Sequence, residues 1–563
     1  MKPIWLHHYP AGVPAQVDVR RYASLTELFA RSCARFSARP AFSNMGVTLS
    51  YDEIDRKSRA FAAYLQQTLG LRKGERVAIM LPNLLQYPVA LFGALRAGLV
   101  VVNVNPLYTA RELRHQLADS GAVAIVVLEN FAHTLQEIIA DTAVRHVVTT
   151  RIGDLFPPLK RCLVNFVVKH VKRMVPPWNL PGATGFDAAL KVGAGGTARE
   201  VPLGPEDIAF LQYTGGTTGV AKGAILTHGN LLANVEQTSA WIGATLKEGE
   251  EVVVTPLPLY HIFALTANLL TFLKWGAHNV LITNPRDLPA FVAELRKTRF
   301  TAITGVNTLF NLLLDAADFD KVSRANAGAL KLAVGGGMAV QRAVAERWQR
   351  ALGVPLIEGY GLTEAAPIVC ANPLDAREFS GAIGLPLPST EVDIRAEEGS
   401  ALPPGEAGEL FVRGPQVMRG YWNMPEETAR VLSPDGWLAT GDICVMDERG
   451  MIRLLDRSKD VIVVSGFKAY PNEIEDVAML HPGVKEAGAV GMADAKSGEA
   501  VWVFVVKKDP ALTAEALIAH CRQHLAAYKV PRHVEFRESL PKSPIGKILR
   551  RTLREDAAAA AAE

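Results

Sequence analysis

The stretch YTGGTTGVAKG at positions 213–223 decides how this chain is organised. Its glycines let backbone N–H groups converge on an anion, its threonine hydroxyls add donors, and Lys222 adds a positive charge. The apolar run at 208–212 predicts a strand that leads into this segment. We therefore predict a phosphate-binding loop. It differs from a Walker A loop, because Gly223 follows the lysine where that loop requires Ser or Thr.

The chain before this loop alternates helix and strand patterns. Ser24 with Glu27, and Ser50 with Glu53, have the spacing of a helix N-cap and its reciprocal acid. Short apolar runs that predict buried strands lie at 76–80, 99–104 and 123–128. Strands that alternate with helices indicate βαβ units around a parallel sheet, so we predict an α/β fold.

The pattern changes near residue 456. The charged run at 456–460 separates two apolar strands, and a segment of mixed α/β character follows it. Strands are expected at 461–464, 484–490 and 501–506, and a helix at 514–525. This length suits one small domain, so we predict an N-terminal domain over 1–456 and a C-terminal domain over 457–563.

The composition is that of a folded protein without a strong electrostatic field. Hydrophobic residues make up 49% of the 563 residues and charged residues 21%, which excludes a mainly disordered chain. Lys and Arg total 60 and Asp and Glu total 57, so no basic field favours nucleic acid as a partner. The cysteines are far apart and form no CxxC pair, which argues against a disulfide framework or a zinc site.

We expect a cytoplasmic protein. Segment 1–14 carries His and Pro where a signal peptide needs an apolar core. The most apolar long stretch, at 89–104, is too short and too polar to span a bilayer.

A basic amphipathic segment lies at 155–178. Apolar side chains recur at helical spacing from Leu159 to Met174, and five Lys or Arg residues accompany them without any acid. Such a helix can lie on an anionic surface, so 159–175 could attach the protein to the inner membrane from the cytoplasmic side. The alternative is a helix that packs on its own domain and exposes a solvated basic face.

Further motifs place the chain in a known family. They are PLYH at 258–261, GGG at 335–337, YGLTE at 360–364, GWLATGD at 436–442, DR at 456–457 and PKSPIGK at 541–547. Together with the loop at 213–223, and in the same order, they resemble the adenylate-forming superfamily of acyl-CoA synthetases, luciferases and adenylation domains. Segment 435–475 resembles the fatty-acyl-CoA synthetase signature, and the whole chain is similar to the bacterial long-chain fatty acid–CoA ligases. The resemblance implies a large N-terminal domain of packed α/β subdomains and a small mobile C-terminal α/β domain.

The resemblance also implies a reaction. A long-chain fatty acid would attack the α-phosphate of ATP to give an acyl-adenylate and pyrophosphate, and the thiol of CoA would then displace AMP. The first step joins two anions, so positive charge must gather at the phosphates. The expected ligands are therefore ATP, Mg²⁺, the fatty acid and CoA as co-substrate, and a homodimer is a further expectation.

The motifs then imply roles for individual residues. Lys547 would bridge the carboxylate and the α-phosphate, and His261 would lie at the carboxylate pocket. The β- and γ-phosphates would bind to Tyr213, Thr214, Gly215, Gly216, Thr217, Thr218, Gly219 and Lys222. The adenine side would be framed by Gly335, Gly337, Glu358, Gly359, Tyr360 and Thr363. Asp442 and Arg457 would hold the ribose, Thr214 and Glu364 the metal, and Gly466 would let pantetheine pass.

Other interpretations of these residues stay open. Glu364 could serve as an acid at the start of a helix, and His261 could be a core residue. The expected acyl walls, Val306, Gly335, Leu362 and Pro367, could equally be core. Lys459 would lie at the hinge about which the small domain rotates. Among functions, a ligase for medium-chain or aromatic acids and a non-catalytic nucleotide- or fatty-acid-binding protein remain the alternatives.

Overall fold

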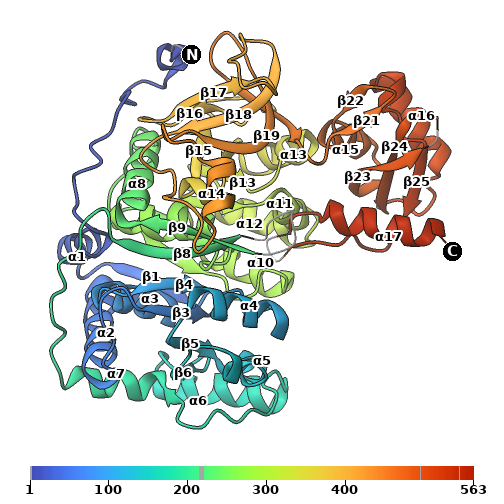
Figure 1. The fold of residues 1–563 in the computed structure, drawn as a ribbon. Helices are drawn as coiled ribbons and strands as arrows, with labels where there is room; N and C mark the ends of the chain where they lie inside the picture. Colours follow the sequence, from blue (N-terminus) through green and yellow to red (C-terminus); the bar gives the residue numbers. More distant parts are fainter. Residues whose placement is uncertain (1–2, 215–220, 495, 544–545, 563) are drawn as a thin grey trace.

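The strands of the protein build four sheets. The computed structural model describes residues 3–214, 221–494, 496–543 and 546–562, and the sheets are formed within these ranges. Two mostly parallel sheets lie one above the other in the N-terminal part, an antiparallel sheet caps them, and the C-terminal part lies to one side (Figure 1). The α/β class predicted from the sequence is confirmed.

The first mostly parallel sheet carries the strand that leads into the predicted phosphate loop. Its order is β7 (Thr184–Gly185), β6 (His146–Thr150), β5 (Ala124–Leu128), β3 (Arg76–Met80), β4 (Val100–Asn103), β8 (Ile208–Thr214) and β9 (Lys222–Thr227). β8 and β9 pair antiparallel, with Thr214 opposite Lys222. The two ends of the loop are therefore held side by side at one edge of this sheet.

The second mostly parallel sheet is the larger one. Its order is β16 (Leu385–Pro386), β15 (Ile368–Ala371), β14 (Leu356–Gly361), β13 (Leu332–Gly336), β12 (Ala302–Gly305), β10 (Val252–Thr255), β11 (His278–Leu281), β1 (Pro40–Asn44) and β2 (Val47–Ser50). The antiparallel cap consists of β17 (Glu391–Arg395), β18 (Ala407–Arg413), β19 (Leu438–Met446) and β20 (Ile452–Arg457).

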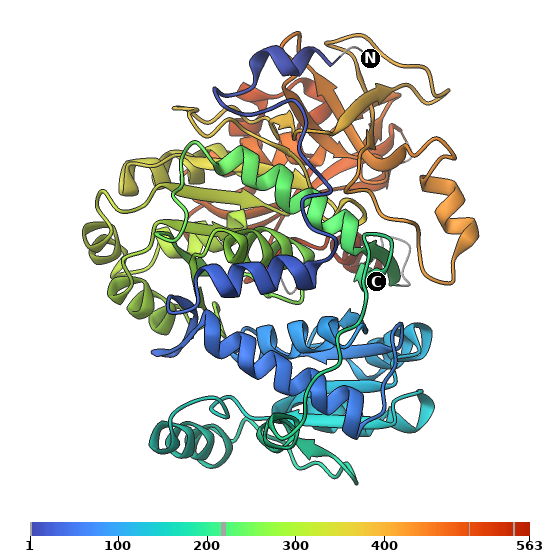
Figure 2. The ribbon, with the colours of Figure 1, turned by 90° about the vertical axis from the view of Figure 1, so that its left-hand side faces the viewer.

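Helices cover these sheets. In the N-terminal part they are α1 (Leu25–Arg35), α2 (Tyr51–Ala63), α3 (Gln86–Arg96), α4 (Ala110–Ser120), α5 (Ala132–Gln136), α6 (Pro158–Phe166), α7 (Phe186–Ala194), α8 (His228–Ile242), α9 (Thr271–Lys274), α10 (Leu288–Lys297), α11 (Asn307–Leu314), α12 (Phe319–Ala325), α13 (Arg342–Leu352) and α14 (Pro425–Val431). Figure 2 shows α1, α2 and α8 crossing the molecule side by side on one face.

The C-terminal part has its own sheet and its own core. The sheet contains β22 (Phe467–Ala469), β21 (Ile462–Val464), β24 (Gly498–Lys507), β23 (Val484–Asp494) and β25 (His533–Phe536). The helices are α15 (Pro471–Leu480), α16 (Ala514–His524) and α17 (Arg550–Ala562). Its buried apolar side chains cluster separately from the large core of the N-terminal part. Because each part buries its own apolar surface, the small one can move as a unit.

The helix starts that the sequence predicts are present. Ser24 caps α1 by accepting the N–H of Glu27, and Ser50 with Glu53 forms a reciprocal capping box at the start of α2. Each satisfies backbone donors that the first turn of a helix leaves unpaired. No helix in the described ranges is both long enough and apolar enough to cross a bilayer.

Candidate active site

A cleft of about 2070 Å³ lies between the sheets and extends under the C-terminal domain. Most of the predicted site residues line it, although they are far apart in the sequence. They are Tyr213, Thr214, Lys222, His261, Gly337, Glu358, Gly359, Tyr360, Thr363, Glu364, Asp442, Arg457 and Lys547. The fold therefore brings together groups that can bind phosphate, sugar, base and carboxylate.

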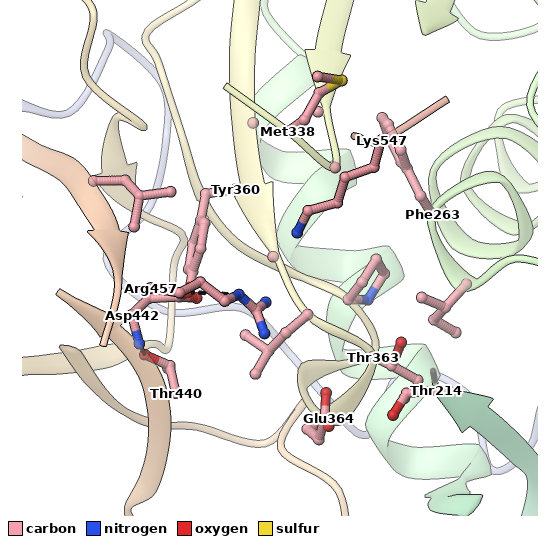
Figure 3. Close-up of a pocket in the computed structure, with 18 of the residues that line it drawn as sticks. Thr214, Phe263, Met338, Tyr360, Thr363, Glu364, Thr440, Asp442, Arg457 and Lys547 are labelled. Atoms are coloured by element: carbon pink, nitrogen blue, oxygen red, sulfur yellow. Dashed lines mark hydrogen bonds and ion pairs between the residues drawn. The ribbon is translucent and has the colours of Figure 1, made fainter. Parts of the chain in front are cut away.

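Asp442 is the centre of a hydrogen-bonded group in this cleft. It lies on β19, and its exposed fraction is only 2%. Tyr360 donates its hydroxyl to Oδ2 of Asp442 at 2.5 Å, and Arg457 Nε lies 3.1 Å from Oδ1 (Figure 3). An ionised carboxylate held in this way is oriented and ready to accept further O–H donors.

Lys547 reaches the cleft from the C-terminal domain. Its backbone N–H donates to Ser543 Oγ at 3.1 Å, and its ammonium points into the space between Tyr360 and Thr363 (Figure 3). Water can reach the Lys547 side chain through the open cleft, but protein on all sides of the cleft reduces the hydration of its ammonium. This desolvation, together with the positive charge of Arg457, lowers the pKa of Lys547 to about 8. It can therefore act as a cation or lose its proton near neutral pH.

Lys222 is paired with an acid from a distant segment. Its ammonium contacts the carboxylate of Glu427 on α14 and lies 5.2 Å from the ring centre of Tyr421. Tyr421 in turn donates its hydroxyl to Glu364 Oε1 at 2.7 Å. One segment, 421–427, thus contacts both Lys222, which is predicted to bind phosphate, and Glu364, which is predicted to bind the metal ion.

Thr214 and Glu364 have the chemistry that Mg²⁺ prefers. Both offer oxygen atoms to the same cleft, and Glu364 already has one oxygen fixed by Tyr421. Among the described residues, no group of three His, Cys, Asp or Glu gathers to hold a metal. Mg²⁺ needs no such cage, because one or two protein oxygens suffice when the substrate supplies phosphates.

Glu358 is a buried carboxyl beside the nucleotide end of the cleft. Oε1 accepts the backbone N–H of Val340 at 2.9 Å, while Oε2 has no hydrogen-bond partner among the described residues. Burial raises the pKa of Glu358 to about 8. Because this carboxyl is protonated at neutral pH, it can donate as well as accept a hydrogen bond.

Tyr213 and His261 both line the cleft, and a hydrogen bond fixes each of them. Tyr213 donates its hydroxyl to Asp119 Oδ2 at 2.5 Å, and a Cβ at Gly223 would lie 3.1 Å from its ring. Tyr213 is therefore held beside Asp119 and the start of β9. His261 Nδ1 accepts the N–H of Phe263 at 3.3 Å, and burial lowers the pKa of His261 to about 4. This histidine is neutral near pH 7.

One end of the cleft is apolar. It passes between α8, the helical segment 264–274 that ends in α9, and the larger sheet. Its lining includes Trp241, Ile242, Phe272, Leu332, Ile357 and Leu374. Trp241 is fixed there, because its Nε1 donates to the carbonyl of Asn372 at 3.1 Å. Leu362 and Pro367, which the sequence analysis expected as acyl walls, line the same cleft.

The remaining expected residues lie elsewhere or outside the described ranges. Gly335 lies within β13, does not line the cleft, and faces Val340, which a Cβ at this position would approach to 2.5 Å. Val306 also does not line the cleft; its side chain lies beside Gly546. Gly466 lies in an exposed turn between β21 and β22, with φ of 85°. The loop residues Gly215, Gly216, Thr217, Thr218 and Gly219 are outside the described residues.

Sequence reasoning missed three residues that the geometry singles out. Tyr421 and Glu427 belong to no recognised motif. Their place in the site is known only from the contacts of Tyr421 with Glu364 and of Glu427 with Lys222. Trp241 lies on α8, in an apolar pattern that resembles any buried helix. The Gly-Tyr-Trp turn at 420–422 was the only local signal, and it does not identify a partner.

The chain is similar to known proteins along nearly its whole length. The AMP-binding enzyme family matches residues 29–422, and the AMP-binding enzyme C-terminal domain matches residues 473–547. The long-chain-fatty-acid–CoA ligase of Escherichia coli O157:H7 is 59% identical over 557 residues, which cover 99% of each chain. The ligase of the same name from Bacillus subtilis is 38% identical and covers 98% of each chain.

A solved structure has the same overall fold. The anthranilate CoA ligase AuaEII, in complex with anthranoyl-AMP, superposes with a TM-score of 0.84 at 25% identity. The match covers 96% of this chain and 98% of that one. From these matches and from the clustered motif residues, the chain belongs to the family of AMP-binding enzymes.

Proposed function

We propose that this protein is an AMP-forming ligase that converts a long-chain fatty acid, ATP and CoA into acyl-CoA, AMP and pyrophosphate. One observation carries the proposal: Lys547 from the small domain and the Asp442–Arg457–Tyr360 group meet in a cleft that has an apolar extension. The near-full-length similarity to long-chain-fatty-acid–CoA ligases supports the same substrate class.

In the first half-reaction, the residues of the cleft orient two anions and stabilise the charge between them. Asp442 accepts the ribose hydroxyls, and Lys222 attracts the terminal phosphates once they displace Glu427. Lys547 donates to both the fatty-acid carboxylate and the α-phosphate, so it neutralises the charge that develops as the new P–O bond forms. His261 is neutral and serves as a hydrogen-bonding wall beside the carboxylate rather than as a cation.

Thr214 and Glu364 would hold Mg²⁺. When bound, Mg²⁺ would neutralise phosphate charge and assist the departure of pyrophosphate. Tyr421 keeps the Glu364 carboxylate aimed at the cleft.

The apolar end of the cleft would bind the alkyl chain. Burial of a methylene group contributes about 0.8 kcal/mol, so a longer chain binds more tightly until the cavity is filled. The aromatic side chains of Trp241 and Phe272 line this end and would limit the chain length that fits. A short or aromatic acid would leave part of the cavity unfilled.

In the second half-reaction, CoA attacks the acyl-adenylate after the small domain has turned. We place the boundary between the domains after residue 456. β20 ends the antiparallel cap at Arg457, and β21 already belongs to the other sheet. The exposed turn at Gly466 could then approach the cleft and admit pantetheine.

We also propose that the α6 region attaches the protein to anionic membranes. α6 lies at the outer edge of the N-terminal part in both views (Figures 1 and 2). Three of its apolar side chains face solvent: the exposed fractions of Leu159, Leu163 and Phe166 are 89%, 63% and 58%. Lys169, Lys172 and Arg173 are exposed nearby, whereas Arg161 is paired with Asp187 at 2.7 Å. Exposed apolar groups flanked by cations suit an anionic lipid surface.

The experiment that tests the proposed activity is pyrophosphate release with ATP, Mg²⁺ and fatty acids of increasing length, with and without CoA. We expect release that CoA stimulates and that is fastest with long chains. A maximum with aromatic or medium-chain acids would change the substrate class, and no release with any acid would favour a binding protein. The homodimer stays a prediction, which the mass in solution would test.

A further inference from the structure

Arg550 joins the two domains next to the catalytic lysine. It is the first residue of α17, which runs from the large domain along the outer side of the small one (Figure 1). Its Nη1 lies 2.7 Å from Asp456 Oδ1 on β20, and its Nη2 lies 2.8 Å from Glu475 Oε2 on α15. The side chain is only 14% exposed, so water and salt screen these pairs less than a surface pair.

Asp456 is the fixed end of this contact. It is fully buried at the end of the N-terminal domain, and its carboxylate also accepts the backbone N–H of Asn472 at 2.8 Å. Asn472 donates its side-chain amide to the carbonyl of Leu455 at 3.2 Å and accepts a hydrogen bond from Arg550. The start of α15 is therefore bound to the end of β20 through Asp456 and Arg550.

These contacts cross between the two domains and therefore depend on how the small domain is oriented. The chain crosses between the domains at 458–461, so rotation there would separate Arg550 and Asn472 from Asp456. In the orientation observed here, Thr308 of α11 also donates to the carbonyl of Gly546 at 3.2 Å, directly beside Lys547. The same orientation places Lys547 in the cleft.

We propose that Arg550 is a positioning residue for adenylation: anchored in its own domain by Glu475, it pairs with Asp456 of the large domain and so holds the small domain where Lys547 reaches the cleft. The thioester step does not need this pair, because the domain has turned by then. The proposal rests on the proposed function, in which the two half-reactions use different orientations.

Loss of the guanidinium would do more than remove one bond. Asp456, Glu475 and Asp460, whose Oδ2 lies 3.7 Å from Arg550, would then face one another without the cation they share. An unpaired buried charge is costly, so the observed orientation would become less populated. Lys547 would remain chemically intact but would spend less time in the cleft.

The test uses the full chain and measures the half-reactions separately. Adenylation is followed by ATP–pyrophosphate exchange with oleate in the absence of CoA, and the thioester step by acyl-CoA formation from supplied oleoyl-adenylate. We expect Arg550→Gln to slow adenylation about 10- to 100-fold and to change the thioester step less than about twofold. Arg550→Lys should recover part of the adenylation rate, because it restores a charge without the bidentate geometry.

Arg532→Gln is the matched control. Arg532 lies in the same small domain but does not line the cleft, is 51% exposed, and pairs with Asp494 at 2.6 Å. We expect both of its half-reactions to match the wild type. Asp456→Asn removes the partner on the other domain. Like Arg550→Gln, it should slow adenylation and change the thioester step little.

A pH profile separates positioning from a general structural defect. Arg550 and Arg457 lower the pKa of Lys547, while Asp442 and Asp460 oppose them. Loss of Arg550 should therefore move the alkaline limb of the residual adenylation to higher pH. Equal loss of both half-reactions, or unchanged adenylation, would overturn the proposal. If the wild type itself shows no adenylation, the proposed function fails instead.

Discussion

The hydroxyl of Tyr360 lies 2.5 Å from Oδ2 of Asp442, so the ring at the nucleotide end of the cleft and the proposed ribose carboxylate form one unit. The two residues come from different sheets, β14 and β19. A hydrogen bond to a charged group typically contributes about 1.5–3 kcal/mol. Tyr360→Phe should therefore raise KM for ATP by about 10- to 100-fold and lower kcat much less. Steady-state kinetics with ATP varied would show this; a fall in kcat at unchanged KM would instead assign Tyr360 to the transition state.

Lys547→Ala should separate the half-reactions. The ammonium stabilises charge only while the acyl-adenylate forms, so we expect adenylation to fall by about 10²- to 10³-fold. Acyl-CoA formation from supplied acyl-adenylate should stay within about threefold of the wild type. Loss of both half-reactions to the same extent would contradict the role given to Lys547.

The pKa of Lys547 sets an alkaline limit for adenylation. The cation is the active form, and its pKa of about 8 means that it loses its proton as pH rises through that value. The rate of adenylation should therefore change little below about pH 7, fall to half near pH 8, and decline tenfold per pH unit well above that value. The residual rate of Lys547→Ala should lack this limb. His261, whose pKa is about 4, should add no inflection near pH 6.5.

Glu427 should compete with the triphosphate for Lys222. Because its carboxylate neutralises Lys222 in the cleft, Glu427→Gln removes a competitor and one negative charge that repels phosphate. We expect KM for ATP to fall by about two- to fivefold. Glu426→Gln, an exposed neighbour on α14, should leave KM unchanged. An increased KM in Glu427→Gln would show that Glu427 aims Lys222 at the phosphates rather than competing with them.

The exposed side of α6 should determine membrane binding. Replacing Leu159, Leu163 and Phe166 by Ser should reduce binding to vesicles of phosphatidylglycerol by at least about tenfold, because three apolar side chains no longer enter the lipid. Gln at Lys169, Lys172 and Arg173 should weaken binding mainly at low salt. Turnover of a soluble acid should not change in either variant. Vesicle binding that neither set of substitutions alters would refute this surface.

The sequence predicted the local features of the fold well. Ser50 and Glu53 specify a helix start through hydrogen bonds between neighbours, and the runs at 76–80 and 123–128 became buried strands because a parallel sheet is covered on both faces. Most of the motif residues that the structure describes line one cleft, whereas Gly335 and Gly466 do not.

Contacts between distant segments could not be predicted in the same way. Lys222 pairs with Glu427, and Arg161 pairs with Asp187, although no periodicity links the members of either pair. Gly335 was expected to contact the nucleotide. In β13, however, a Cβ at this position would point toward Val340. These contacts depend on how the sheets and helices pack, which a one-dimensional pattern does not contain.

The contacts described between the two domains are ionic pairs and hydrogen bonds, with Asp456, Arg550 and Asn472 at their centre. Such groups are hydrated readily when they separate, whereas an apolar interface would have to expose its surface to water each time. The proposed rotation of the small domain would therefore uncover polar groups at this contact, and a polar surface associates with other proteins less than an apolar one.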